Sequence, residues 1–183
     1  MRANLKVTWA SVLVLLGLVV VSPLSVMGAA GQIPAQSEAN VQRQVLHQLR
    51  MLPYYTIFDD LNFKVEGDTV MLSGQVVDPV LKSDAAGVVK HIEGVQRVIN
   101  NIEVLPVSDF DNRIRFAEYR AIYSSPGFER YFSALPPIHI IVKNGHVKLI
   151  GVVADQFDRN VAGMRANGVP GVFSVENDLR VES

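Results

Sequence analysis

The sequence VEGDTVMLSGQV, residues 65–76, is repeated in altered form as VKNGHVKLIGVV at residues 142–153. The same offset continues without a gap over residues 63–104 and 140–181. The identical pairs are Val65/Val142, Val70/Val147, Leu72/Leu149, Gly74/Gly151, Val76/Val153, Asp78/Asp155, Ala85/Ala162, Gly94/Gly171, Val95/Val172, Val98/Val175, Asn100/Asn177 and Val104/Val181. Most of these residues are apolar or glycine, which is typical of positions that hold a backbone and a core. The pattern therefore predicts an internal duplication of one small domain, and it does not by itself indicate an activity.

A β-hairpin is predicted at the start of each repeat. The expected strands are residues 63–66, 69–76, 140–143 and 146–153. They flank Gly67-Asp68 in the first repeat and Asn144-Gly145 in the second. Asn-Gly favours a tight two-residue turn, because both central residues of such a turn need a positive φ. Apolar and polar residues alternate along the second strand, so one face of the sheet should be buried.

Two glycines occupy the same place in the second strand of each hairpin, Gly74 and Gly151. A glycine inside a strand usually marks a bulge or the close approach of another backbone. We interpret both glycines as room for a helix that crosses the sheet.

A helix is predicted after each hairpin. Asp78 and Asp155 stand where helix N-caps are expected, and Pro79 takes the first helical position in the first repeat. The apolar residues at helical spacing are Leu81, Ala85, Val88 and Ile92 in the first helix and Phe157, Val161 and Met164 in the second. We expect these helices to end near Gly94 and Gly168.

Each repeat is completed by a third strand and preceded by a further helix. The third strands are expected at residues 95–104 and 172–181, directly after Gly94 and Gly171. The leading helices are expected at residues 38–52, with Val41, Val45, Leu49 and Leu52 on one face, and at residues 112–123. The fold class is therefore α+β, with two small helix-strand-strand-helix-strand sandwiches in tandem.

Residues 1–30 are predicted to be a signal peptide. A basic start is followed by an almost wholly apolar run at residues 9–21 and by small residues that favour cleavage after Gly28 or Ala30. After cleavage we expect no transmembrane span. The alternative is an uncleaved helix that anchors the chain in the inner membrane, because residues 9–27 are barely long enough to cross a bilayer core of about 30 Å.

Three segments are expected to follow the signal peptide. Residues 31–37 hold too little apolar surface to fold and are predicted to be a flexible lead-in. The first domain is placed at residues 38–106 and the second at residues 107–183.

The composition excludes several classes of protein. The chain has no cysteine, which rules out disulfides, thiolate metal sites, a cysteine nucleophile and a lipid-bearing cysteine. Its formal net charge is -1, whereas proteins that bind nucleic acid are normally basic. An exported chain without cysteine suits the bacterial periplasm.

The repeated unit resembles a BON domain, a small module found singly or in tandem in bacterial envelope proteins of the osmotically inducible periplasmic type. The resemblance rests on the two hairpins, on the capping aspartates and on the endings GVQRVINNIEV (94–104) and GVFSVENDLRV (171–181). The second repeat departs from the family pattern at Gly163 and Pro170. The resemblance implies a non-enzymatic binding protein, with phospholipid membranes as the ligand usually proposed for the family.

No motif in the sequence predicts an enzyme, a metal site or a cofactor. The histidines are His47, His91, His139 and His146, and none has a recognised ligand spacing. The acidic pairs near residues 59 and 111 lack the offsets of a calcium loop. Nucleophile-elbow and phosphate-loop motifs are also missing from the sequence.

Residues 110–132 stand out because they combine seven of the chain's aromatic residues with four arginines. Aromatic rings flanked by cations favour a membrane surface or an anionic lipid headgroup. The predicted lipid-contact residues are Arg113, Arg115, Phe116, Tyr119, Arg120 and Tyr123. The alternative for the same residues is packing within the fold. The corresponding alternative function is a periplasmic module that binds another envelope protein without touching lipid.

Overall fold

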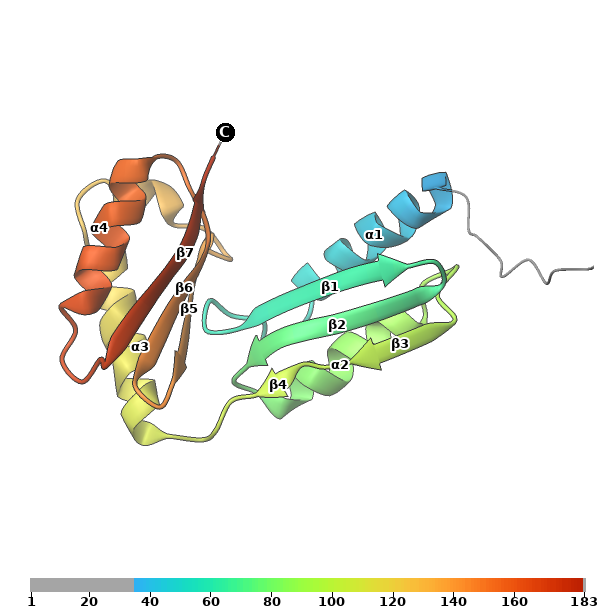
Figure 1. Cartoon of the computed structure of the whole chain (residues 1–183), viewed down its shortest axis with the longest axis horizontal. Coiled ribbons are helices and arrows are strands. Elements are labelled where there is room, and N and C mark those ends of the chain that lie inside the picture. Colours follow the sequence, from blue (N-terminus) through green and yellow to red (C-terminus); the bar gives the residue numbers. More distant parts are fainter. Residues whose placement is uncertain (1–34, 183) are drawn as a thin grey trace, which may run out of the picture. The chain divides into compact units, whose positions relative to one another are not determined.

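The first repeat folds into a four-stranded sheet whose apolar face is covered by two helices (Figure 1). The computed structural model describes residues 35–182 of the chain. The elements in chain order are α1 (Ala35–Arg50), β1 (Asp60–Glu66), β2 (Thr69–Val76), α2 (Pro79–Lys90), β3 (Arg97–Asn100) and β4 (Glu103–Val104). β2 pairs antiparallel with β1 and parallel with β3 and β4. Because parallel neighbours need a crossover connection, α2 returns the chain across the sheet between them.

The second repeat has the same plan with one addition. Its elements are α3 (Asp109–Tyr123), the 3-10 turn η1 (Phe128–Tyr131), β5 (Ile138–Lys143), β6 (His146–Val153), α4 (Gln156–Asn167) and β7 (Ser174–Val181). β6 pairs antiparallel with β5 and parallel with β7. Figure 1 shows α3 and α4 on the same side of this sheet. The predicted α+β class and the predicted order of elements are therefore confirmed in both repeats.

The N-terminal predictions fall mostly outside the described residues. The predicted signal peptide, residues 1–30, and residues 31–34 of the lead-in lie outside them. The lead-in was expected to extend to residue 37, whereas α1 already begins at Ala35. Ala and Gln have favourable helix propensities, so they extend the helix before its first apolar residue. No helix within residues 35–182 is long and apolar enough to cross a membrane.

Each repeat buries an apolar core between helices and sheet, and the core of the second also includes Ile57 from the segment between α1 and β1. The core of the first includes Val41, Val45 and Leu49 from α1, Val70, Leu72 and Val76 from β2, and Leu81, Ala85 and Val89 from α2. The core of the second includes Ile114, Ile122, Ile138, Ile140, Val142, Leu149, Val153, Ala162, Ala166 and Leu179. Full burial of one such aliphatic side chain stabilises the fold by about 1.5–3 kcal/mol. These contacts explain why the repeated positions are apolar.

The turn residues and the capping aspartates adopt the conformations and contacts that the sequence predicts. Asn144 and Gly145 both have positive φ, 52° and 76°, in the β5–β6 turn. The side chain of Asp78 accepts a hydrogen bond from the backbone amide of Val80 at 2.8 Å at the start of α2. Asp155 does the same for α4, because it accepts from the amide of Asp158 at 2.8 Å. Gly94 and Gly171 lie in the turns that precede β3 and β7.

The interpretation of the strand glycines as room for a helix is wrong. Gly74 and Gly151 have φ of +116° and +131°, a region that side chains rarely adopt. A Cβ on Gly74 would meet the carbonyl oxygen of Asp60 at 2.1 Å, and one on Gly151 would meet that of Pro137 at 1.8 Å. The close neighbour is therefore the backbone at the start of the adjacent strand in the same sheet, and no helix is involved.

A repeated asparagine ties the third strand of each repeat to its helix. Asn100 Nδ2 donates to the carbonyl of Lys82 at 2.7 Å, and Asn177 Nδ2 donates to that of Arg159 at 2.7 Å. The Oδ1 of each accepts from the amide two residues later, at Ile102 and Leu179. In the first repeat the predicted strand 95–104 is split into β3 and β4 just after this asparagine, whereas β7 is continuous.

α4 turns its large apolar residues outward. Phe157 and Met164, predicted at helical spacing, are 70% and 67% exposed. The residues that α4 buries are Asp158, Ala162, Gly163 and Ala166. Small side chains let the helix lie close to β7, where a Cβ on Gly163 would meet Asn177 Nδ2 at 2.7 Å. The outward apolar side chains of α4 are therefore not explained by the core.

Candidate functional site

The position of α3 decides which of its side chains are available to a ligand. The helix begins at its N-cap Ser108, whose hydroxyl accepts from the amide of Asp111 at 3.1 Å. The residues that it buries are Asp111, Ile114, Arg115, Glu118, Ile122 and Tyr123. These recur at steps of three and four, so they form one face, and the opposite face is left for solvent.

Two of the six predicted lipid-contact residues are on the buried face. Arg115 is 2% exposed, and its guanidinium donates to Asn112 Oδ1 and to the carbonyl of Val142, both at 2.6 Å. Tyr123 is also 2% exposed, and its hydroxyl donates to the carbonyl of Ile138 at 2.8 Å. Burial raises the pKa of Tyr123 above its usual range. The predicted lipid contact is therefore wrong for Arg115 and Tyr123, which join α3 to β5.

The other four predicted residues, Arg113, Phe116, Tyr119 and Arg120, are on the exposed face of α3. Phe116 is 58% exposed, which is a large fraction for a phenylalanine on a folded domain. The ring of Tyr119 packs against that of Tyr123 in a tilted arrangement, with 5.1 Å between ring centroids. The structure thus keeps two arginines and an exposed aromatic ring together on one helix face.

α4 adds residues to this surface that the sequence interpretation missed. Two adjoining hollows along α3 have cavity volumes of 440 and 410 Å³ and share Ala117, Arg120 and Pro170. Met164 and Arg165 from α4 line the second hollow. The sequence signal for Met164 was its helical spacing, which we had assigned to the buried face. We call the exposed residues Arg113, Phe116, Arg120, Met164 and Arg165 the outer helical face.

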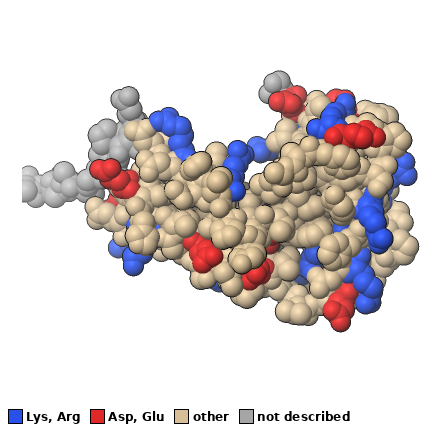
Figure 2. Space-filling view, turned by 180° about the vertical axis from the view of Figure 1, so that it is seen from behind, with Lys and Arg blue, Asp and Glu red and all other residues tan. Residues whose placement is uncertain are grey.

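The three arginines of the outer helical face have no acidic partner among residues 35–182. The ion pairs found there involve Lys64, Arg130, Lys143 and Lys148 instead. Glu118 lies on the opposite, buried face of α3 and is 0% exposed, so its carboxyl does not balance them at the surface. Figure 2 shows several separate Lys and Arg groups on the coloured surface of this repeat, with uncharged areas between them.

An aromatic group extends this surface at the β5–β6 turn. Phe110 also lines the first hollow and lies against Phe173, with 5.9 Å between ring centroids. Phe173 is 69% exposed and also contacts the ring of His146 at 5.9 Å. Both phenylalanines approach Gly145, where a Cβ would lie 2.7 Å from Phe173. Exposed apolar rings therefore continue from α3 to this end of the sheet.

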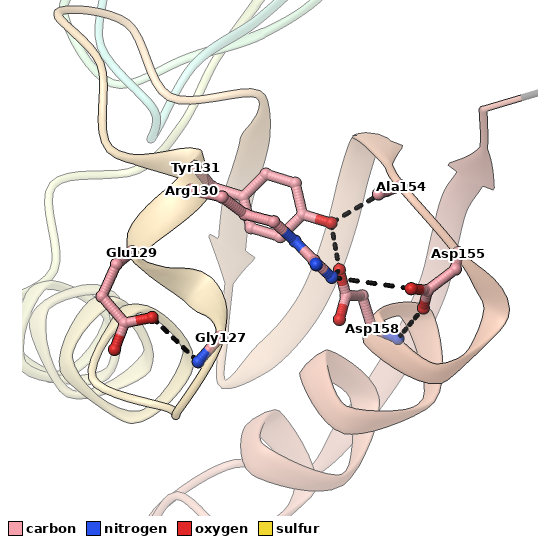
Figure 3. Close-up of polar contacts among 7 residues, drawn as sticks. All are labelled: Gly127, Glu129, Arg130, Tyr131, Ala154, Asp155 and Asp158. Atoms are coloured by element: carbon pink, nitrogen blue, oxygen red, sulfur yellow. Dashed lines mark hydrogen bonds and ion pairs between the residues drawn. The ribbon is translucent and has the colours of Figure 1, made fainter.

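A polar cluster fixes η1 to the start of α4. Figure 3 shows the Tyr131 hydroxyl and the Arg130 guanidinium directed toward the carboxylate of Asp158, to which both are hydrogen-bonded. The Tyr131 oxygen also accepts from the amide of Ala154 at 2.8 Å, and Arg130 lies 3.6 Å from Asp155. Asp158 is 2% exposed, so these contacts satisfy a buried charge. They hold in place α4, which carries Met164 and Arg165 of the outer helical face.

The histidines do not assemble into a metal site. His139 Nδ1 lies 2.6 Å from the carbonyl oxygen of Asp59, and His146 Nδ1 lies 2.7 Å from Ser174 Oγ. His139 and His146 lie toward opposite ends of the β5–β6 hairpin. Within residues 35–182 no group of three or more histidine, aspartate or glutamate side chains is arranged to hold a metal ion.

The comparison with protein families agrees with this architecture. The BON domain family model matches residues 35–106 and 128–183. The chain belongs to the BON domain family. BON domains are non-catalytic modules of proteins that are generally associated with the bacterial envelope. The second match begins after α3, although α3 contributes Ile114 and Ile122 to the core of the second module.

Similarity to individual proteins is weak. No curated protein matches the chain. One structure of CdsD, a structural protein of the type III secretion system of Chlamydia trachomatis, is 13% identical with a TM-score of 0.32, over 78% of this chain and 92% of that one. A structure of the C-terminal domain of CdsD is 13% identical with a TM-score of 0.27, over 77% of this chain and 96% of that one.

Proposed function

We propose that the protein is an exported, non-catalytic BON protein that associates with anionic phospholipid through the outer helical face of its second module. Residues 1–30 serve as the signal peptide, and the periplasm is the destination. The second module spans residues 107–183, because α3 packs into its core. The observation that carries the proposal is the joint exposure of Phe116 and Met164 beside arginines that have no acidic partner among the described residues.

The chemistry of the outer helical face suits a membrane–water interface. Each arginine near an anionic bilayer contributes about 1 kcal/mol of attraction, so three contribute about 3 kcal/mol at physiological salt. That attraction alone is weak and is screened by added salt. Phe116 and Met164 supply the second component, because exposed apolar side chains gain free energy when they leave water for the acyl-chain boundary.

The shape of the surface also supports peripheral attachment. The hollows along α3 are open, and their lining includes arginines and small residues, with Ala117 in both and Ala121 in the second. A lipid headgroup can approach such a surface without a change in the fold.

Vesicle sedimentation of residues 31–183, which form one compact unit, tests this proposal. We expect binding to vesicles of phosphatidylcholine with phosphatidylglycerol and little binding to phosphatidylcholine alone. Arg113→Glu with Arg120→Glu should weaken the binding at least about tenfold, because each reversal replaces an attraction of about 1 kcal/mol with a repulsion. Arg43→Glu with Arg97→Glu makes the same change of charge on exposed residues of the first module and should have a much smaller effect.

The alternative function, binding of an envelope protein without lipid contact, predicts a different result. In that case anionic vesicles would not retain the protein, or both double variants would bind equally well. Retention by a purified partner in the absence of vesicles would then replace the lipid proposal.

A further inference from the structure

β7 is an edge strand of the second module, with one side paired to β6 and the other side open. The order of its sheet is β5-β6-β7, and among residues 35–182 the strand β7 pairs, along all eight of its residues, with β6 alone (Figure 1). Long open edges are sites at which another strand adds to a sheet. We propose that two copies of this chain pair antiparallel through β7, which joins the two three-stranded sheets of the second modules into one.

The backbone of β7 has hydrogen-bonding groups left for such a partner. The amide of Glu182 donates to the carbonyl of Val153 at 2.8 Å, so the even-numbered residues of this strand face β6. The odd-numbered residues therefore direct their amides and carbonyls away from the sheet. They are Val175, Asn177, Leu179 and Val181. The carbonyl oxygen of Asn177 already accepts from Arg159 Nη2 at 3.1 Å, which leaves it one lone pair for a partner strand. The amide of Leu179 makes only a long bond, 3.3 Å, to Asn177 Oδ1.

Charge selects the register of the pairing. In an antiparallel pair, two residues that lie opposite one another either both direct their backbone amides and carbonyls toward the partner strand or both direct them away. One allowed register is therefore converted into the next by a shift of two residues. The register centred on Asp178 places Glu176 opposite the partner's Arg180, and it does so twice by symmetry. The register centred on Asn177 places Glu176 opposite Asp178, which brings like charges together twice. The register centred on Leu179 pairs Asp178 with the partner's Arg180, but it places Glu176 opposite the partner's Glu182, which again brings like charges together twice. Like charges directly opposite one another are destabilising.

The remaining contacts agree with the register centred on Asp178. Val175 then lies opposite the partner's Val181, and both can form the hydrogen-bonded pairs of the ladder. Arg180 is exposed and forms no ion pair within residues 35–182. The two Asp178 side chains face one another, but each is held by its own Lys148 at 2.7 Å. Lys148 thus neutralises the one unfavourable pair.

The absence of cysteine allows a direct test by cross-linking. In this register the Cα atoms of the two Asp178 residues lie about 4.5 Å apart, within the range of a disulfide. The two Glu176 residues lie about four residues apart along the strands, or roughly 13 Å. In residues 31–183, Asp178→Cys should therefore give a disulfide-linked dimer under mild oxidation, and the matched variant Glu176→Cys should not. Equal cross-linking of both variants, or of neither, overturns the proposal.

A charge exchange tests the same register without a covalent bond. Light scattering after size exclusion should show a dimer whose fraction rises with concentration. Glu176→Arg alone and Arg180→Glu alone should each raise the dissociation constant by about tenfold, because two attractive pairs become repulsive. The double variant should restore dimerisation, and circular dichroism should show that all variants fold. A monomer at all concentrations, a dimer insensitive to the single changes, or no rescue would contradict the proposal.

Discussion

The carboxylate of Asp111, in the first turn of α3, accepts a hydrogen bond from the backbone amide of Gly145 at 2.8 Å. Its other oxygen accepts from the amide of Asn144 at 2.9 Å. The helix that carries the outer helical face is thus fixed to the tip of the β5–β6 hairpin. Because Asp111 is 0% exposed and Gly145 is buried, the Gly145 amide has no water as a substitute partner.

Asp111→Asn should destabilise the second module by about 2 kcal/mol, because one amide loses its charged acceptor and meets a donor instead. The measurement is the free energy of unfolding from urea denaturation. Asp109→Asn, on the exposed side of the same helix turn, is the control and should change stability by less than about 0.5 kcal/mol. Equal effects of the two changes would contradict the role assigned to Asp111.

Gly74→Ala and Gly151→Ala should each destabilise the protein by about 3 kcal/mol or prevent folding. The added Cβ would lie within 2.1 Å of a backbone carbonyl oxygen at both positions, and the positive φ adds backbone strain. Gly87→Ala is the matched control, because nothing lies within 4 Å of a Cβ at this position in α2. It should stabilise α2 by up to about 1 kcal/mol. Thermal unfolding midpoints that fall by the same amount in all three variants would refute this account.

Glu118 should make stability depend on pH in the direction opposite to most carboxylates. Neither of its carboxylate oxygens has a hydrogen-bond partner within residues 35–182, and burial raises its pKa from 4.5 to about 8. The folded state therefore keeps the proton between pH 4.5 and 8, whereas the unfolded chain releases it. The free energy of unfolding should fall as the pH rises through this window and should level off above about pH 8.

Glu118→Gln removes this titration and should give a flatter dependence of stability on pH between 5 and 8. Glu93→Gln, at an exposed position of the first module, should leave the wild-type slope unchanged. Urea denaturation at three pH values within the window measures both slopes. A Glu118→Gln variant whose slope equals that of the wild type would show that Glu118 is ionised in the folded protein at neutral pH.

Tyr131→Phe tests the cluster that holds α4 against η1. Removal of the hydroxyl takes a donor from the buried Asp158 and an acceptor from the amide of Ala154. We expect a loss of about 1–3 kcal/mol in the free energy of unfolding. Tyr119→Phe is the control, because the Tyr119 side chain is partly exposed on α3 and should tolerate the change. If Tyr131→Phe lowers the free energy of unfolding no more than Tyr119→Phe does, the hydrogen bonds of the cluster contribute little to stability.

Much of the fold could be predicted from the sequence, because residues with strong local preferences recur at the same positions in both repeats. The strand alternation, the Asn144-Gly145 turn and the capping aspartates are local signals, and each produces the expected element. The role of the strand glycines was harder to predict, because the backbone that excludes a side chain there belongs to Asp60 or Pro137, in another part of the chain. A glycine in a sequence shows that space is restricted but not which backbone restricts it.

The candidate site was predicted less well than the fold. Arg115 and Phe116 are adjacent in sequence, yet one is buried and the other is exposed, because 100° of helix rotation separates them. Composition alone could not assign the two faces of α3, since the buried face also carries Asp111 and Glu118. On α4 the reverse error occurred: Met164 is apolar, but Ala162 and Ala166 fill the core.

The most direct measurement of the central claim uses tryptophan as a probe of membrane contact. The chain's one tryptophan is Trp9, so residues 31–183 have none. Met164→Trp should show a fluorescence blue shift and quenching by brominated acyl chains when anionic vesicles are added. Tyr54→Trp, at a position 70% exposed in the first module, should show neither change. If Met164→Trp stays water-exposed on vesicles that retain the protein, or if Tyr54→Trp responds equally, the outer helical face is not the membrane contact.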